Sequence, residues 1–424
     1  MTVESQRPSL TSVGPRSAPP AEADEGLRGS GFWTVAFAFL IVMAFATLPS
    51  PLYGLYRLRD NLSAFTVTVV FAIFAAGTIT ALLGVGFVAG RIGRRGVMIL
   101  AVAIMMVAAG LLAGWEALPG LLLGRLLSGL AVGLAAGTGI TYLLELRLRA
   151  DPSASPVRAR NIGTAVNVGG LGVGPLIAGC LAQWARWPLV LPYLVVVALG
   201  AVALLGLRLV PETSPAATTA AGALAGPTRA QQAKSPARLP APAAAGTLTA
   251  FAASGLFAGL AGLFLATTLR HPAHVLSGAT LFLVFSSGVM SQLVTTRWRP
   301  SQVLAFGTGS MLAGLLLLVL SVWLAVPSLA LFLIGGALIG AGAGAVFKGT
   351  TGIVLEAAAP DERLRLTSGL LVALYVGLSV PVVGAGIALD QGVSARDSVL
   401  AFAVFVAVGV SGAGWALLRR RAVT

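Results

Sequence analysis

Long apolar stretches alternate with short polar segments along almost the whole chain. A helix rises about 1.5 Å per residue, so about 20 apolar residues are needed to cross the ~30 Å hydrocarbon layer of a bilayer. The pattern predicts twelve membrane-spanning helices, over residues 32–55, 65–89, 96–114, 119–144, 162–182, 189–209, 247–268, 275–295, 301–324, 328–355, 367–389 and 398–418. Pro49 and Pro51 are expected to kink or end the first helix, because proline has no backbone N–H to donate.

Two long polar segments divide this pattern. Residues 1–31 are polar and Pro-rich and lack the charged-then-apolar order of a signal peptide, so a disordered tail is expected. Residues 211–246 are rich in Ala, Pro and Thr without an apolar period, as in a flexible linker. We therefore predict an all-α membrane protein with two six-helix bundles, at 32–210 and 247–418, and a short tail at 419–424.

The composition makes a lipid bilayer the expected environment. The chain is 57% hydrophobic and only 10% charged, with a mean hydropathy of +0.92. A soluble domain carries roughly 25% charged residues. The net charge of +14 does not indicate a nucleic-acid partner, because the basic residues lie in short clusters between apolar runs and not on one polar face.

The distribution of basic residues predicts the orientation. Of the 28 Lys and Arg residues, 21 lie on the side of the N-terminus and 5 on the opposite side, while Arg125 and Lys348 lie inside predicted helices. By the positive-inside rule, both termini are expected to be cytoplasmic. Abundant Arg and Ala favour a GC-rich bacterial genome, and hence a multi-pass protein of the bacterial inner membrane.

Landmarks of the first half recur in the second. Two glycines and a glutamate recur at an offset of 211 residues, and a glycine and a proline recur at an offset of 206. The pairs are Gly129 and Gly340, Gly133 and Gly344, Glu145 and Glu356, Gly163 and Gly369, and Pro175 and Pro381. A duplicated six-helix unit predicts a substrate site near mid-membrane between the halves, with alternating access. The two glutamates lie at helix ends, where pairing with Arg147 or Arg365 is expected.

A glycine- and arginine-rich turn follows the second predicted helix. It reads Gly86-x3-Gly90-Arg91-x-Gly93-Arg94-Arg95. This segment resembles the signature loop of the major facilitator superfamily, Gly-x3-Asp-Arg-x-Gly-Arg-Arg, with Gly90 at the acidic position. In the family that acid helps to lock helices together at the cytoplasmic face, so the resemblance implies a lock without its acid. The alternative is a simple positive-inside anchor.

Arg125 lies within the fourth predicted helix. A guanidinium there costs about 2.5–3.5 kcal/mol on insertion scales, so it is expected to face a cavity or a partner. Arg125, Gly129 and Gly133 resemble the family's motif in this helix, whose arginine is implicated in proton coupling in drug antiporters. The alternative is an arginine that extends to the headgroups.

The fifth predicted helix carries Gly170, Gly174, Pro175 and Gly179. Small residues at intervals of four let a neighbouring backbone approach closely. The pattern Gly-x3-Gly-Pro-x3-Gly resembles the antiporter motif of the superfamily, which is associated with exporters more than importers. The alternative is close helix packing without a role in the direction of transport.

The first, fourth, seventh and tenth helices are expected to line a mostly apolar central cavity. The residues predicted to bind substrate or to couple transport are Arg125, Lys348, Asn167, Tyr142, Gln292 and Tyr375. Such a wall suits a lipophilic small molecule, neutral or anionic, better than a sugar. For Lys348, extension of the side chain to the interface is an equal alternative.

The resemblance implies a bacterial drug or metabolite efflux permease, and the stretch 49–53 resembles a feature of one actinobacterial branch. Export by proton antiport is the expected function, by a monomer, without cofactor or metal. The chain has no phosphate-binding loop and no catalytic arrangement, so an enzyme is not expected. No carboxylate lies in the middle of the first or fourth helix to carry a proton. The alternatives are an importer of a sugar, carboxylate or other nutrient, and a receptor or assembly factor.

Overall fold

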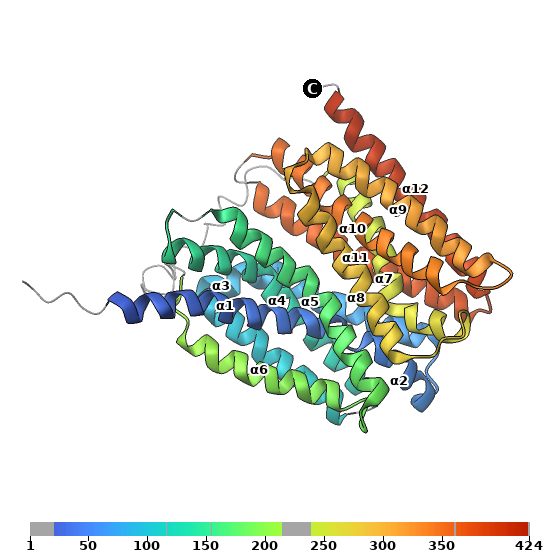
Figure 1. Ribbon diagram of the computed structural model, residues 1–424, viewed down its shortest axis with the longest axis horizontal. Coiled ribbons are helices and arrows are strands. Elements are labelled where there is room, and N and C mark those ends of the chain that lie inside the picture. Colours follow the sequence, from blue (N-terminus) through green and yellow to red (C-terminus); the bar gives the residue numbers. More distant parts are fainter. Residues whose placement is uncertain (1–20, 116, 154, 214–238, 360–361, 423–424) are drawn as a thin grey trace, which may run out of the picture.

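The computed structural model describes residues 21–115, 117–153, 155–213, 239–359 and 362–422, with the side chains of 21–30, 364 and 420–422 outside the description. All regular secondary structure in the described residues is helical (Figure 1). The first half contains α1 (Ala21–Thr47), η1 (Ser50–Leu52), α2 (Tyr53–Asp60), α3 (Ala64–Gly114), α4 (Leu118–Ala150), α5 (Pro156–Trp184) and α6 (Leu191–Leu209). The second half contains α7 (Ala241–Thr267), α8 (His274–Val294), η4 (Thr295–Arg297), α9 (Pro300–Trp323), α10 (Leu329–Ala357), α11 (Arg363–Asp390) and α12 (Ala395–Ala422).

Eleven helices of the described residues are long and apolar enough to cross a membrane. One of them, α3, has 51 residues and is interrupted at Gly93, where φ is 72° and ψ is 175°. Phe74 and Leu112 would be about 57 Å apart in one straight helix, at about 1.5 Å for each of 38 residues. They nevertheless contact α4 only five residues apart, at Gly129 and Gly124. The chain therefore reverses at Gly93, and the predicted fold of twelve crossings in two bundles is confirmed.

Proline ends the first crossing as predicted. Regular α-helix stops at Thr47, and the chain continues through η1 before α2 begins. The predicted outer boundaries of two polar segments are wrong. Residues 21–31, expected in a disordered tail, are helical, and α7 begins at Ala241 within the expected linker. Alanine favours helix at both places, and Pro242 lies in the first turn of α7, where a missing N–H costs nothing.

The repeated glycines allow the same close contact between two helices in both halves. On α4, Gly129 and Gly133 lie against the backbone of α3, at the carbonyls of Phe74 and Thr78. On α10, Gly340 and Gly344 lie against the backbone of α8, at the carbonyls of Val284 and Gly288. A Cβ at any of the four would overlap a carbonyl oxygen, so these helix pairs depend on glycine for their close approach.

Because twelve crossings separate them, α1 begins and α12 ends on one face of the molecule, here called the termini face. The opposite face is called the far face. The two bundles are joined chiefly by α5 against α8 and by α3 against α11. Gly179 contacts Gly278 near the far face, and Gly172 contacts Phe282 at about the middle of the helices. In Figure 1 the bundles meet at the far face and diverge toward the termini face.

Candidate functional site

Arg125 lies in a buried polar group near the end of α1. Arg125 is only 1% exposed. Its Nη1 donates to the carbonyl oxygen of Ala46 at 2.9 Å and to Oγ of Ser128 at 3.3 Å. The Ala46 carbonyl is available because α1 ends at Thr47, and the last carbonyls of a helix lack an intrahelical donor. The end of α1 therefore supplies the acceptor for the buried cation.

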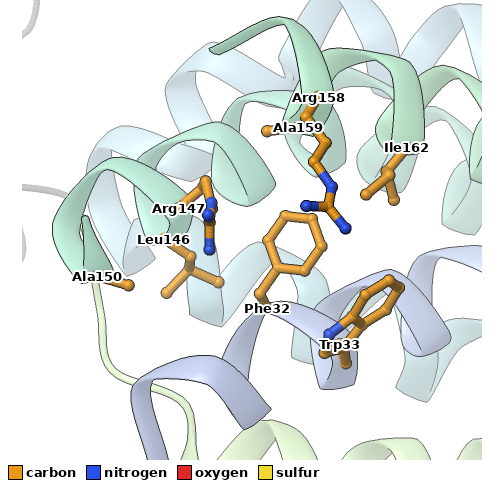
Figure 2. Close-up of a pocket in the computed structure, with 8 residues that line it drawn as sticks. All are labelled: Phe32, Trp33, Leu146, Arg147, Ala150, Arg158, Ala159 and Ile162. Atoms are coloured by element: carbon orange, nitrogen blue, oxygen red, sulfur yellow. The ribbon is translucent and has the colours of Figure 1, made fainter. Parts of the chain in front are cut away.

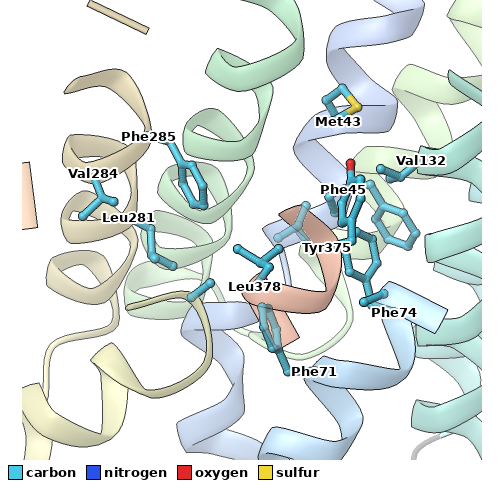
Figure 3. Packing of buried hydrophobic residues seen from close by; sticks show 14 of the residues in the cluster. Met43, Phe45, Phe71, Phe74, Val132, Leu281, Val284, Phe285, Tyr375 and Leu378 are labelled. Carbon is cyan, nitrogen blue, oxygen red and sulfur yellow. The ribbon is translucent and has the colours of Figure 1, made fainter. Parts of the chain in front are cut away.

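Aromatic contacts connect this buried polar group to the second bundle. The Arg125 guanidinium carbon lies 4.6 Å from the centroid of the Phe74 ring on α3. The Phe74 ring packs edge-on against Tyr375 of α11, with the ring centroids 6.2 Å apart (Figure 3). Arg125 and Tyr375, both predicted site residues, thus share one neighbour at the contact between the bundles.

Part of the hydrogen-bonding capacity of this group is unused. Nε and Nη2 of Arg125 and the hydroxyl of Tyr53 are buried and make no hydrogen bond of good geometry among the described residues, although the Tyr53 hydroxyl lies close enough to the guanidinium to interact with it. Three residues after Tyr53, the hydroxyl of Tyr56 shares a hydrogen bond of 2.9 Å with the hydroxyl of Tyr193 on α6. Burying polar atoms without good hydrogen bonds costs free energy, so an acceptor on a ligand that paired with the Arg125 donors would recover part of that cost.

The other predicted residues are distributed over different places. Asn167 on α5 is half-buried, and its Oδ1 is without a partner among the described residues. Nζ of Lys348 donates to the backbone carbonyl of Gln292 and, at 3.3 Å, to Oγ1 of Thr295. These acceptors lie at the end of α8, where carbonyls favour a cation. Lys348 therefore joins the ends of α10 and α8 near the termini face, away from Arg125.

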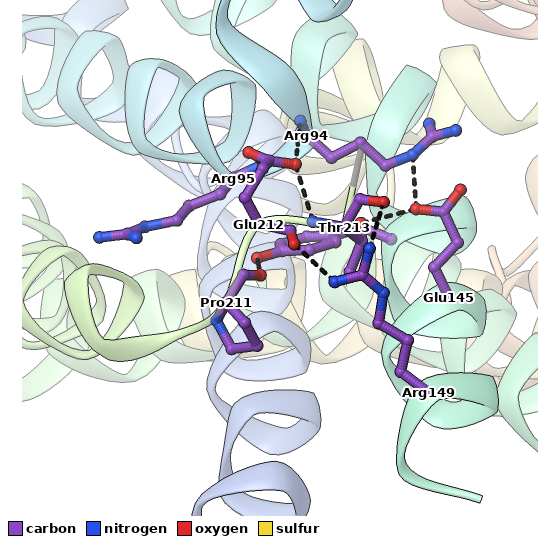
Figure 4. Close-up of polar contacts among 8 residues, drawn as sticks. Arg94, Arg95, Glu145, Arg149, Pro211, Glu212 and Thr213 are labelled. Atoms are coloured by element: carbon purple, nitrogen blue, oxygen red, sulfur yellow. Dashed lines mark hydrogen bonds and ion pairs between the residues drawn. The ribbon is translucent and has the colours of Figure 1, made fainter. Parts of the chain in front are cut away.

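The turn at Gly93 binds the segment that follows α6. The Glu212 carboxylate accepts hydrogen bonds from the backbone N–H groups of Arg94 and Arg95, both at 3.0 Å, and from that of Thr213 at 2.9 Å (Figure 4). Gly93 is needed for two reasons: its φ of 72° lies in the left-handed region, and a Cβ would overlap the Glu212 carboxylate. Glu212 thus provides a carboxylate at a loop whose usual acidic position holds Gly90.

Side chains of α4 hold the same segment from the other side (Figure 4). Arg149 donates to the carbonyls of Glu212 at 2.7 Å and Thr213 at 2.8 Å. Thr213 in turn donates its hydroxyl to Glu145 at 2.6 Å, and Glu145 forms an ion pair with Arg94 at 2.7 Å. We call Arg94, Arg95, Tyr142, Glu145, Arg149 and residues 211–213 the linker clamp.

Two expectations are corrected by the linker clamp. Glu145 pairs with Arg94 and not with Arg147, because the turn at Gly93 brings Arg94 to the end of α4. Tyr142 was expected in the central cavity, but its hydroxyl donates to the Pro211 carbonyl at 2.9 Å. Glu212 was missed because it follows the last apolar helix of the first half and was counted with the linker. A lone acid beside an arginine-rich turn that lacks one is the signal that could have found it.

We expect Glu212→Ala to lower the free energy of unfolding by about 1–3 kcal/mol, because it leaves three backbone donors without their acceptor. The thermal stability of the purified protein measures this effect. Glu362→Ala is the matched control, because it makes the same change on the same face, at the start of α11, where the Glu362 side chain makes no capping hydrogen bond. Equal melting temperatures for the two variants would show that the linker clamp contributes nothing to stability.

The glycines of α5 bring it into contact with helices of both bundles. Gly170 and Gly174 lie against the α1 backbone, and Gly179 lies against α8. Pro175 has no N–H for the carbonyl of Leu171, four residues earlier, and Oγ1 of Thr47 donates to that carbonyl at 2.6 Å. The motif therefore joins α5 to the polar end of α1 on one side and to the second bundle on the other.

A carboxylate of the second bundle caps a helix of the first at the far face. Asp390, at the end of α11, accepts hydrogen bonds from the backbone N–H groups of Ala64 at 2.9 Å and Phe65 at 3.1 Å. These donors belong to the first turn of α3, which favours a negative charge. If the bundles separate at the far face during transport, this contact must break.

We expect Asp390→Asn to shift the protein away from the described state, because an amide oxygen accepts these hydrogen bonds more weakly than a carboxylate does. A single cysteine placed near the far-face contact, on a Cys180→Ser background, should then react faster with a membrane-impermeant maleimide. Asp60→Asn serves as control, since Asp60 pairs with the adjacent Arg59 on the same face. Unchanged labelling in Asp390→Asn would show that this cap does not hold the far face closed.

Two bundles of six crossings that pack through α5 against α8 and α3 against α11 are the architecture of a multi-pass membrane transporter. A family model described as Major Facilitator Superfamily matches residues 35–318. The chain belongs to the major facilitator superfamily.

Similar proteins include two fungal transporters and a solved structure. The chain is 27% identical over 175 residues to the MFS efflux transporter aclA of Aspergillus oryzae (strain ATCC 42149 / RIB 40), covering 40% of this chain and 30% of that protein. It is 34% identical over 106 residues to the MFS-type transporter gkaD of Penicillium citrinum, covering 24% and 17%. The chain thus matches less than a third of the length of these curated relatives.

Crystal structures of the nucleoside transporter NupG share the fold. One gives a TM-score of 0.65 at 14% identity, covering 93% of this chain and 98% of that chain. The structure of a point mutant of the same transporter gives a TM-score of 0.66 at 12% identity, covering 91% and 99%. At these identities the likeness concerns the fold alone.

Proposed function

We propose that this protein is a secondary transporter that exports a small lipophilic compound by proton antiport, with its termini face in the cytoplasm. The observation that carries the proposal is that the two bundles pack through α5 against α8 and α3 against α11, while their ribbons diverge toward the termini face (Figure 1). At the far face a cavity of about 550 Å³ lies between the bundles, lined by residues that include Tyr53, Arg57 and His274. Rocking of the two bundles about these helix contacts is the movement that alternating access requires.

Three observations support export and a lipophilic substrate. The glycine and proline pattern of α5 forms close contacts with α1 and α8, as an element that moves between two packings would. The buried surface between the bundles is aromatic and aliphatic, including Phe71, Phe74, Tyr375 and Leu378 (Figure 3). One of the curated relatives is described as an efflux transporter.

We propose Arg125 as the residue that binds the substrate or couples its transport to protons. Two of its donors make no hydrogen bond of good geometry with the described residues, and in this water-poor setting a hydrogen bond to a carbonyl, carboxylate or phenolate is stronger than in water. A neutral or anionic compound is therefore preferred over a cationic drug. Asn167, whose Oδ1 has no hydrogen-bond partner within the part of the chain that the structure describes, is a second candidate contact.

Transport measured in vesicles of both orientations tests the proposal. A thermal-shift screen of lipophilic neutral and anionic compounds first supplies ligands, because binding raises apparent stability by mass action. Each ligand is then assayed in inverted and right-side-out bacterial membrane vesicles. Accumulation in inverted vesicles that depends on an acid lumen supports export by proton antiport. Gradient-dependent uptake by right-side-out vesicles would instead support an importer.

A further inference from the structure

A small pocket lies at the termini face of the first bundle, outside the proposed transport path. It has a volume of about 130 Å³ and is formed by the middle of α1, the end of α4 and the beginning of α5. Its floor is apolar, from Phe32 and Ile162, while Arg147 and Arg158 border it (Figure 2). The two arginines come from different helices and stand on either side of the Phe32 ring.

The positive charge of this pocket is hardly compensated by the described residues. Arg158 has neither a hydrogen bond nor an ion pair among the residues that the structure describes. Among the described residues Arg147 has a long contact of 4.0 Å with Asp151, and Asp151 also accepts two hydrogen bonds from Ser153, at 3.0 and 2.6 Å. Two guanidinium groups beside one cavity repel each other, so an anion between them relieves that repulsion.

The aromatic residues place the pocket at the level of the lipid headgroups. Trp33 is 59% exposed at the start of the apolar part of α1, whereas the adjacent Phe32 is buried. Exposed tryptophan at such a boundary is typical of the bilayer interface. An apolar floor beside two cations fits an amphipathic ligand, with acyl chains along the protein and an anionic head at the arginines.

We propose that this pocket binds the phosphodiester headgroup of an anionic phospholipid from the leaflet at the termini face. Guanidinium groups suit this ligand because each can donate two parallel hydrogen bonds to phosphate oxygens. The lipid would connect the end of α4 to the start of α5. Because α4 carries the linker clamp and α5 contacts the second bundle, a bound lipid would stiffen the connection between these two elements.

Binding is measured on the full-length purified protein in nanodiscs that contain phosphatidylglycerol and phosphatidylcholine, by mass spectrometry of the retained lipid. We expect a preference of roughly 25-fold for phosphatidylglycerol, at about fivefold for each arginine near the headgroups. The Arg147→Gln/Arg158→Gln variant should lose this preference. Arg160→Gln/Arg297→Gln is the matched control, with the same change in charge at two exposed arginines of the termini face outside the pocket.

The outcomes separate the lipid from other sources of the same chemistry. Retention of phosphatidylglycerol by the pocket variant at the level of the control variant would overturn the proposal. A rise in melting temperature with inorganic phosphate as large as the rise with phosphatidylglycerol would also overturn the proposal, since the site would then bind free phosphate. A fall in melting temperature of the pocket variant that is the same in phosphatidylcholine alone would assign the arginines to contacts within the chain. The proposal is supported if the pocket variant loses the preference for phosphatidylglycerol while its melting temperature in phosphatidylcholine stays unchanged.

Discussion

Replacing Gly174 by alanine should abolish transport and strongly lower stability. A Cβ at this position would overlap the backbone carbonyl oxygen of Ala44, which cannot move without shifting α1. Overpacking of a rigid interior costs about 1–3 kcal/mol and occasionally more, and contact with backbone places this change at the upper end. Separation of α5 from α1 would also break the hydrogen bond from Thr47 to Leu171. The melting temperature and vesicle transport of the purified variant measure both effects.

Gly169→Ala is the matched control, because a Cβ at Gly169 meets nothing within 4 Å. It lies on the same helix and makes the same chemical change, so any general effect of alanine on α5 appears in both variants. We expect its stability and transport to remain near those of the unaltered protein. A Gly174→Ala variant as stable and active as Gly169→Ala would show that α1 and α5 do not pack as described.

The fold followed from the sequence because a bilayer allows few solutions. Apolar runs of sufficient length must be helices, and the glycine pairs repeated at an offset of 211 residues occupy equivalent helix contacts in the two bundles. Even the reversal within α3 was predicted from Gly93 and its arginines, although the helical content on either side is nearly continuous. A turn of this kind is determined by residues adjacent in sequence, so it can be predicted from one sequence alone.

The candidate site was less predictable because its contacts join residues far apart in sequence. The acceptor for Arg125 is a backbone carbonyl of residue 46, and any residue type can provide one. The anchoring of Glu212 depends on backbone N–H groups more than 100 residues earlier in the chain. Asp390 caps a helix of the other bundle in the same way. Side-chain patterns do not record such partners, so the linker clamp and the far-face cap emerged only from the structure.

Arg125→Met should remove transport while leaving the protein folded. A buried cation with one close carbonyl acceptor bears a desolvation cost of several kcal/mol, which methionine does not. Methionine also fills similar space and packs well against the Phe74 ring. Loss of the donor to Ala46 costs about 1–3 kcal/mol in the other direction. The two effects largely offset each other, so we expect a melting temperature near that of the unaltered protein and a fall in transport of more than roughly tenfold, about 1.4 kcal/mol.

This dissociation distinguishes a functional arginine from a structural one. Arg186→Met, an exposed loop position at the far face, controls for loss of a positive charge and should leave transport intact. Arg125→Lys keeps the charge but not the planar fork, so transport that survives in it would indicate a purely electrostatic role. If Arg125→Met instead loses stability and transport together, the arginine holds α1, α3 and α4 in place. If Arg125→Met retains both stability and transport, the substrate binds without Arg125, and the substrate-binding residues must lie elsewhere between the bundles.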